Sequence, residues 1–260
     1  MRDLIFTVDL DRDVNLPRGG EFEAGSIDRG SGDSPRFSSA DRGLSVLLDL
    51  LDDMGVTATF FVEGRTSEVV DCSRISGHCI GFHGYDHEDL TGASTGLRPT
   101  DGQLEGILRT GFEAVSDNVS RPVCFRAPYM SVDGRVLDAV SSLGIVHDSS
   151  FYAGPEVGAY PLPNGMVEHP VPKGADRGGR TIAAYLWPLH EGRRVPQDYI
   201  DLAMSSDADE FVLATHTWHM VEGRDTGPMG RSEIESNADS VRRVLEGILD
   251  GGFRATALVR

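Results

Sequence analysis

Two histidines four residues apart are the first candidates for chemistry in this chain of 260 residues. They are His83 and His87, and they follow a short apolar run. At that spacing a helical turn or a tight loop points both imidazoles the same way, so the pair could share a divalent metal ion. Paired histidines also arise by chance, and a histidine beside apolar residues is often structural. The pair therefore needs a third ligand before it indicates a metal site.

Candidates for that third ligand stand near the N-terminus, where Asp9 and Asp11 directly follow an apolar segment. One carboxylate oxygen and two imidazole nitrogens leave coordination positions free for water and substrate, as a catalytic zinc ion requires. The residue types alone therefore favour a hydrolytic metal site.

The composition narrows the partners and the compartment. A net charge of −17 argues against nucleic acids and anionic membranes as partners, because both require clustered basic residues. No stretch approaches the roughly 20 apolar residues of a membrane span. The first residues run directly into a strand-like segment without a secretory signal, so we expect a cytoplasmic enzyme. The oligomeric state stays open, with a homo-oligomer among the alternatives.

The three cysteines, Cys72, Cys79 and Cys124, show no CxxC spacing. Their odd number and their spacing predict neither a disulfide framework nor a thiolate metal site.

Alternating strand-like and helix-like segments must position the polar residues. A strand is predicted over 4–8, Ser38 and Ser39 are N-cap candidates for a helix that ends near Gly55, and a second strand covers 56–62. Such a unit implies a parallel strand pair with a right-handed crossover. The pattern continues with strands at 79–82, 123–125, from 145, 181–186, 211–215 and 253–259, and with helices at 103–116, 134–143, 196–204 and 232–249.

This order predicts one α/β domain over 1–260, either a barrel or an open parallel sheet, with a long loop at 14–36. Polar clusters follow several of the predicted strands at corresponding positions, where the carboxyl ends of parallel strands build active sites. These clusters are Asp9 with Asp11, His83 with His87, Arg126 to Tyr129, Asp148, and His216.

At these clusters the chain resembles the polysaccharide deacetylase family, also known as the NodB-homology or carbohydrate esterase 4 group. The first matching motif of this chain resembles that of a subgroup whose members read Asp-x-Asp. This subgroup includes peptidoglycan-deacetylase-like and allantoinase-like amide hydrolases. The resemblance implies a distorted (β/α) barrel of about seven parallel strands. The matching segments, in the family's order, are Thr7-Val-Asp9-Leu-Asp11, Ala58 to Val62, Gly77 to His87, Phe125-Arg-Ala-Pro-Tyr129, His147 to Phe151, and Leu213-Ala-Thr-His216.

The resemblance implies a divalent metal ion, with zinc expected, held by Asp11, His83 and His87. Asp9 would be the general base. A second metal ligand is the alternative for Asp9, because Asp-x-Asp places both carboxylates on one face of an extended strand.

The third motif would support the base and the transition state. Arg126 would keep Asp9 ionised and oriented. The backbone N–H of Tyr129 would form an oxyanion hole with the metal, and Pro128 would fix the approach to that turn.

The last motifs would supply the general acid. His216 would protonate the leaving amine, and Asp148 would raise the pKa of His216 by pairing with it directly or through Arg126. His219 is the alternative acid. Trp218 would wall a pocket for the acyl methyl group.

These roles imply a metal-dependent amide hydrolase. The expected reaction is N-deacetylation of an N-acetylated amino sugar or glycan precursor, releasing acetate by attack of a metal-bound water. One alternative is a ring-opening hydrolase of a cyclic amide or imide, similar to allantoinase. Another is a catalytically silent protein that binds a glycan. Loop 14–36 leaves the strand with Asp9 and Asp11, so we expect it to cover the site and shape specificity.

Overall fold

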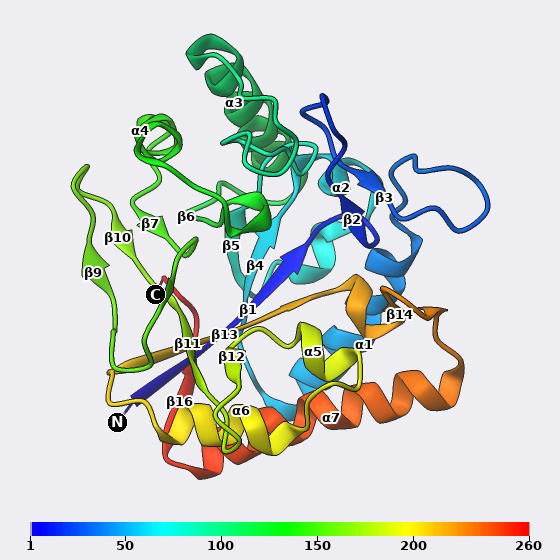
Figure 1. Cartoon of the computed structure of the whole chain (residues 1–260), viewed down its shortest axis with the longest axis vertical. Helices are drawn as coiled ribbons and strands as arrows, with labels where there is room; N and C mark the ends of the chain where they lie inside the picture. The colour runs from blue at the N-terminus through cyan, green and yellow to red at the C-terminus, as the bar shows by residue number, and fades with distance from the viewer. Residues whose placement is uncertain (1, 260) are drawn as a thin grey trace.

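A curled, mostly parallel sheet forms the centre of the structure, a computed structural model that describes residues 2–259 (Figure 1). Its strand order is β13-β1-β4-β5-β6-β7-β10-β9, and β16 also pairs with β1. Only β9 is antiparallel to its neighbour within this described sheet. The expected distorted (β/α) barrel is confirmed. The strands are β1 (Arg2–Leu10), β4 (Thr59–Val62), β5 (Cys79–Phe82), β6 (Cys124–Phe125), β7 (His147–Asp148), β9 (Tyr160–Pro161), β10 (Val167–Glu168), β13 (Glu210–His216) and β16 (Phe253–Thr256).

Strand β1 is the axis of the sheet. It pairs with β13 along most of its length, while β16 and β4 share its other edge, one beside each half. Leu4, Phe6 and Val8 have no exposed surface, as expected for a parallel strand covered on both faces. In the register with β13, Asp9 stands beside His216. Strand pairing alone therefore brings these distant residues together.

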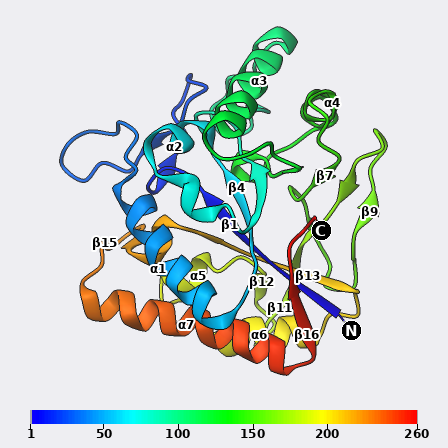
Figure 2. The ribbon, with the colours of Figure 1, turned by 180° about the vertical axis from the view of Figure 1, so that it is seen from behind.

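Helices cover both sides of the sheet. In Figures 1 and 2, α6 and α7 lie side by side along the lower side with α1 next to them, and α2, α3 and α4 lie along the upper side. The helices are α1 (Ser38–Met54), α2 (Gly64–Val69), α3 (Asp101–Asn118), α4 (Gly134–Ser142), α5 (Trp187–His190), α6 (Pro196–Met204) and α7 (Arg231–Asp250).

Helix α1 begins differently from the prediction. Its N-cap is Phe37, and neither Ser38 nor Ser39 caps it. The carboxylate of Asp13 instead accepts hydrogen bonds from the backbone N–H groups of Ser39 and Ala40 at 3.0 and 2.7 Å. A carboxylate suits a helix N-terminus, where N–H groups lack partners. The cap thus ties the helix to the segment that follows β1.

Loop 14–36 contains a small hairpin of β2 (Asn15–Leu16) and β3 (Gly25–Ser26). Farther along, Arg29 and Arg36 form ion pairs with the buried Glu222 of β14 (Glu222–Gly223). The loop is therefore fixed against the segment that follows His216. Smaller sheets complete the fold, with strands β8 (Tyr152–Ala153), β11 (Val171–Ala175), β12 (Thr181–Ala183) and β15 (Gly227–Pro228).

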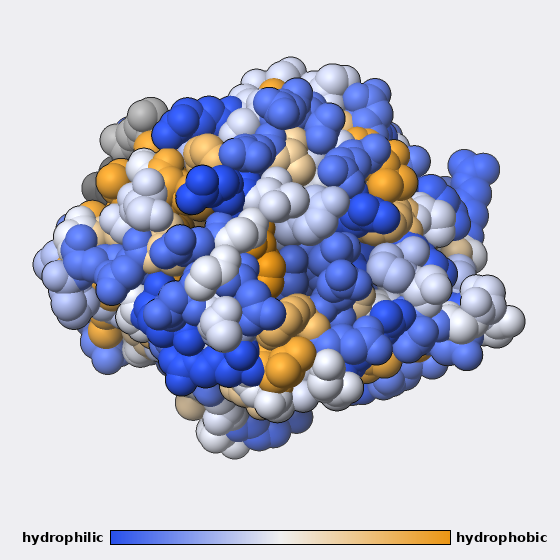
Figure 3. All heavy atoms as spheres, turned by 90° about the horizontal axis from the view of Figure 1, so that it is seen from above, coloured by the Kyte–Doolittle hydropathy of each residue, from blue (hydrophilic) through white to orange (hydrophobic). Residues whose placement is uncertain are grey.

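The face seen from above in Figure 3 is mainly hydrophilic, and hydrophobic residues form smaller patches between the hydrophilic ones. Within residues 2–259, none of the helices combines the length and the apolar character needed to cross a membrane.

Candidate active site

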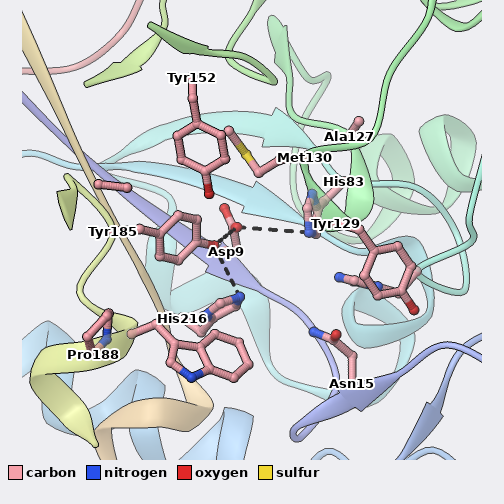
Figure 4. A pocket seen from close by; sticks show the side chains of 13 residues that line it. Asp9, Asn15, His83, Ala127, Tyr129, Met130, Tyr152, Tyr185, Pro188 and His216 are labelled. Atoms are coloured by element: carbon pink, nitrogen blue, oxygen red, sulfur yellow. Dashed lines mark hydrogen bonds and ion pairs between the residues drawn. The ribbon is translucent and has the colours of Figure 1, made fainter. Parts of the chain in front are cut away.

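The predicted site residues converge at the carboxyl ends of neighbouring strands. Asp9 lies on β1, His83 follows β5 and His216 ends β13. They face a cavity of about 340 Å³ (Figure 4). The cavity is lined by Asp9, Asn15, His83, His87, Ala127, Tyr129, Met130, Tyr152, Ala183, Tyr185, Trp187, Pro188 and His216.

Three residues form a group that fits a divalent metal. One ligand atom each from Asp11, His83 and His87 lies within 4.8 Å of the others, and all three residues are buried. Nδ1 of His83 lies 2.7 Å from the carbonyl oxygen of Arg126, which can only accept, so Nδ1 carries the hydrogen and Nε2 is bare. Oδ1 of Asp11 is buried without a hydrogen-bond partner among the described residues. An unpaired oxygen beside two imidazoles matches an open zinc-type donor set.

The electrostatics of this group also suit a cation. Burial raises the pKa of Asp11 to about 7 and lowers the pKa of His87 to about 3. Both shifts penalise the charged form of the side chain, and a bound cation would stabilise ionised Asp11 beside neutral His87. Asn15 orients Asp11 by donating from Nδ2 to Oδ2 at 2.7 Å.

A buried arginine, Arg12, connects the segment that carries Asp11 with the segment that carries His87, and the sequence reasoning missed it. Nε of Arg12 donates to Oε1 of Glu63 at 2.7 Å, and Nη2 donates to Oδ1 of Asp86 at 2.7 Å. Arg12 follows Asp11 in the chain, and Asp86 precedes His87. The ion pairs therefore fix two ligands from different strand ends against each other. The sequence feature that could have revealed this role is an arginine between two aspartates, Asp11 and Asp13, directly after a buried strand.

Asp9 is held by both of its oxygens. Nη1 of Arg126 donates to Oδ1 at 3.0 Å, and the hydroxyl of Tyr185 donates to Oδ2. Burial raises the pKa of Asp9, but the charge of Arg126, together with other contacts that include the hydrogen bond from Tyr185, outweighs it and lowers the pKa to about 2. Asp9 lies outside the group of three metal-ligand candidates. Its geometry suits an ionised base better than a second ligand.

The turn after β6 brings Tyr129 into the cavity. Tyr129 adopts a left-handed backbone with φ of 59°, which is uncommon for a residue with a side chain. Its ring packs edge-on against His87, with 4.5 Å between the centroids. Pro128 was expected to bind substrate, but it does not line the cavity. Pro128 instead packs closely against Gly84, so closely that a Cβ added to Gly84 would lie 3.1 Å from Cγ of Pro128.

The expected partnership of Asp148 with His216 is wrong. Asp148 pairs with Glu168, because β7 and β10 are parallel neighbours with these residues in register. Its Oδ1 also accepts from the hydroxyl of Ser150 at 2.7 Å. Burial raises the pKa of both carboxyl groups, that of Glu168 to about 10. The pKa of His216 is lowered by burial instead of raised by Asp148.

The imidazole of His216, not that of His219, faces the cavity. Nε2 of His219 lies 2.8 Å from Oε1 of Glu191, and His219 is absent from the lining. Nε2 of His216 lies 3.1 Å from the hydroxyl oxygen of Tyr185. The geometry therefore favours His216 as the acid.

The aromatic wall differs from the prediction. Trp218 has no exposed surface and lies behind Trp187, with 5.2 Å between their ring centroids. Trp187 lines the cavity in its place, together with Ala183 and Tyr185. Ala183 ends β12, Tyr185 forms a bridge with β13, and Trp187 is the first residue of α5. Three different local structures therefore bring these side chains to one wall.

Comparisons with known proteins agree with this architecture. Residues 33–147 match the family model described as polysaccharide deacetylase, a range that includes His83, His87, Arg126 and Tyr129. A chitin deacetylase from Pestalotiopsis sp. is 35% identical over 108 residues, covering 38% of this chain and 34% of that protein. A peptidoglycan deacetylase-like protein from Gibberella zeae is 33% identical over 135 residues, covering 48% and 37%. The chain spans about a third of the length of these curated relatives.

A solved structure is similar over almost the whole chain. It is a family 4 carbohydrate esterase from Streptomyces lividans in complex with acetate, with a TM-score of 0.54 and 13% identity, covering 99% of this chain and 93% of that one. At this identity the likeness shows the fold alone. The matched family model over residues 33–147, the curated relatives and this fold together make the chain similar to the polysaccharide deacetylase family.

Proposed function

We propose that this chain is a metal-dependent amide hydrolase that removes the N-acetyl group from an N-acetylated amino sugar or glycan precursor. One observation carries the proposal. A single cavity brings an open group of metal-ligand candidates beside a paired carboxylate, Asp9, and an imidazole, His216. The match of residues 33–147 to the polysaccharide deacetylase model, and the likeness to proteins described as a chitin deacetylase and a peptidoglycan deacetylase-like protein, support the choice of reaction.

Asp11, His83 and His87 would hold the metal, and their one oxygen and two nitrogens suit zinc. When bound, such an ion supplies Lewis-acid chemistry, lowering the pKa of water and polarising an amide carbonyl.

The chain's own residues supply proton transfer and orientation. Asp9, ionised and held by Arg126, accepts the proton of the attacking water. The backbone N–H of Tyr129 donates to the carbonyl oxygen as negative charge develops on it. His216, as the imidazolium, gives a proton to the amine nitrogen as the C–N bond breaks and returns to the neutral imidazole, so acetate and a free amine leave. The aromatic wall around Trp187 excludes water from the acyl group.

A second candidate is the ring opening of a cyclic amide or imide. The cavity of about 340 Å³ is walled by Tyr152, Tyr185 and Trp187, and a compact ring would fit between these aromatic side chains. A catalytically silent glycan-binding protein is less favoured, because the candidate base, acid and metal ligands all surround one cavity.

The test is a substrate screen with the zinc-loaded protein. N-acetylglucosamine, its oligomers and nucleotide-linked N-acetyl sugars are assayed for acetate, and cyclic amides and imides are assayed for ring opening. Acetate release that disappears in Asp9→Asn while zinc affinity persists supports the proposal. The exposed Asp117 of α3 provides the matched control, Asp117→Asn, which retains activity. Ring opening without acetate release from any acetylated sugar would replace the proposal with the second candidate.

A further inference from the structure

The hydroxyl of Tyr185 lies between the proposed base and the proposed acid. It donates to Oδ2 of Asp9, and its oxygen lies 3.1 Å from Nε2 of His216 (Figure 4). Neither the sequence motifs nor the roles described above give Tyr185 a part in the reaction. A single side chain that contacts both groups can fix their orientation relative to each other.

The direction of these hydrogen bonds follows from the donor inventory. An ionised carboxylate only accepts, so the single hydrogen of the Tyr185 hydroxyl points toward Asp9. The hydroxyl oxygen then offers a lone pair to His216. A bare Nε2 at that position would place two acceptors 3.1 Å apart, so Nε2 must carry a hydrogen. Nδ1 of His216 is buried and has no hydrogen-bond partner within residues 2–259, as suits the bare nitrogen.

We propose that Tyr185 is a positioning residue that orders a chain of hydrogen bonds from His216 through Tyr185 to Asp9, and so keeps the His216 proton on Nε2. Arg126 ends the chain by donating to the other oxygen of Asp9. The inference rests on the proposed function, because it sets the resting state of the acid. The neutral ring holds its hydrogen on Nε2 toward the hydroxyl, and a second proton on Nδ1 makes the imidazolium that serves as the acid. It adds a residue and a tautomer that the function does not require.

The backbone holds Tyr185 in register with the strand that carries His216. Tyr185 forms an isolated parallel bridge with Ala214, two residues before His216 on β13. The carbonyl oxygen of Ala214 accepts from the N–H of Leu186 at 2.7 Å, and the N–H of Ala214 donates to Ala184 at 2.8 Å. Only 9% of Tyr185 is exposed. Its hydroxyl is therefore fixed by strand pairing.

The first test is spectroscopic and needs neither metal nor turnover. In zinc-free protein labelled with ¹⁵N-histidine at pH 7.5, the ring nitrogens of His216 are assigned by their loss in His216→Gln. The wild type is expected to show the Nε2–H tautomer, and Tyr185→Phe is expected to show a mixture of the two tautomers. An Nδ1–H tautomer in the wild type, or an unchanged tautomer in Tyr185→Phe, would overturn the proposal.

The second test is kinetic. Tyr185→Phe is expected to lower kcat by about 10- to 100-fold, within the range for acid–base contributions, with KM changed less than about threefold. The matched control is Tyr199→Phe, which removes a buried hydroxyl that donates to the Tyr185 carbonyl at 3.2 Å without reaching the cavity. That control is expected to keep kcat and the tautomer. Equal losses in both variants would reduce Tyr185 to a structural residue and overturn the proposal. A wild type that releases no acetate would refute the proposed function, and the tautomer measurement would still decide the role of Tyr185.

Discussion

Replacing the buried Arg12 with methionine is expected to lower the free energy of unfolding by about 3–5 kcal/mol, the usual loss when one partner of a buried ion pair is removed. The side chains of Arg12 and Glu63 have no exposed surface, and that of Asp86 is 14% exposed. Methionine fills part of the space but provides no charge. Two carboxylates would therefore lose their counter-charge where water cannot replace it.

The remaining contacts of Glu63 set the upper limit of this loss. Its carboxylate still accepts from the backbone N–H at position 12 at 2.8 Å and from the hydroxyl of Thr66 at 2.5 Å. The side chain of Arg12 donates two hydrogen bonds to Glu63, one to Asp86 and one to the carbonyl oxygen of Ala24. Hydrogen bonds to charged groups contribute about 1.5–3 kcal/mol each, so losing even two of them reaches the range above. For a domain of this size, Tm would fall by about 6–20 °C.

Urea unfolding of the metal-free protein, followed by circular dichroism, measures the change. Arg18→Met is the matched control, because Arg18 pairs with Glu21 and Asp33, which are both more than half exposed. Its loss should cost at most about 1 kcal/mol. Zinc affinity gives a second readout, and Arg12→Met should lower it more than about 10-fold, because Arg12 orients the neighbours of Asp11 and His87. A loss equal to that of Arg18→Met would refute the role of the ion pairs.

Three further predictions concern the metal and the cavity. His87→Ala should weaken zinc binding at least about 100-fold in a chelator competition while the fold persists, and unchanged affinity would remove His87 from the ligand set. Zinc affinity should rise with pH up to about 7 and then level, because the pKa of Asp11 is raised to about 7 and zinc must displace that proton at lower pH, whereas His87, with a pKa lowered to about 3, releases none. Titration calorimetry would contradict this if the affinity were flat from about pH 5.5 to 7.5. Trp187→Leu should raise KM about 3- to 10-fold with thermal stability nearly kept, because Trp187 lines the cavity. Trp218→Leu should mainly lower stability, because Trp218 is buried. The opposite pattern would show that Trp218, and not Trp187, contacts the substrate.

The elements that could be predicted are those specified by local sequence. Helix α6 begins at Pro196, whose ring suits the first helical turn, and α1 ends before Gly55, which adopts φ of 63°. Parallel topology then placed the polar residues that follow the strands at one edge of the sheet. The convergence of Asp9, His83 and His216 could be expected because it needs only this topology.

The residues that were missed depend on long-range register. The partner of Asp148 is set by the pairing of β7 with β10, and the chain between them has no periodicity that fixes this register. Trp187 and Trp218 are chemically alike, and only the packing of their segments decides which one faces the cavity. Tyr185 matters because a bridge aligns it with β13, and a single isolated bridge leaves no sequence pattern.

The central place of β1 has a consequence for the order of folding. Arg2 pairs with Phe253 and Asp9 with His216, so during synthesis β1 must wait for β13 and β16 before its pairing is complete. Contacts so distant in sequence form slowly, because loop closure must precede them. Until then β4 can cover only one half of one edge of this apolar strand, and the backbone groups left unpaired invite pairing with other chains. The strand that carries the proposed base, Asp9, therefore needs protection during synthesis.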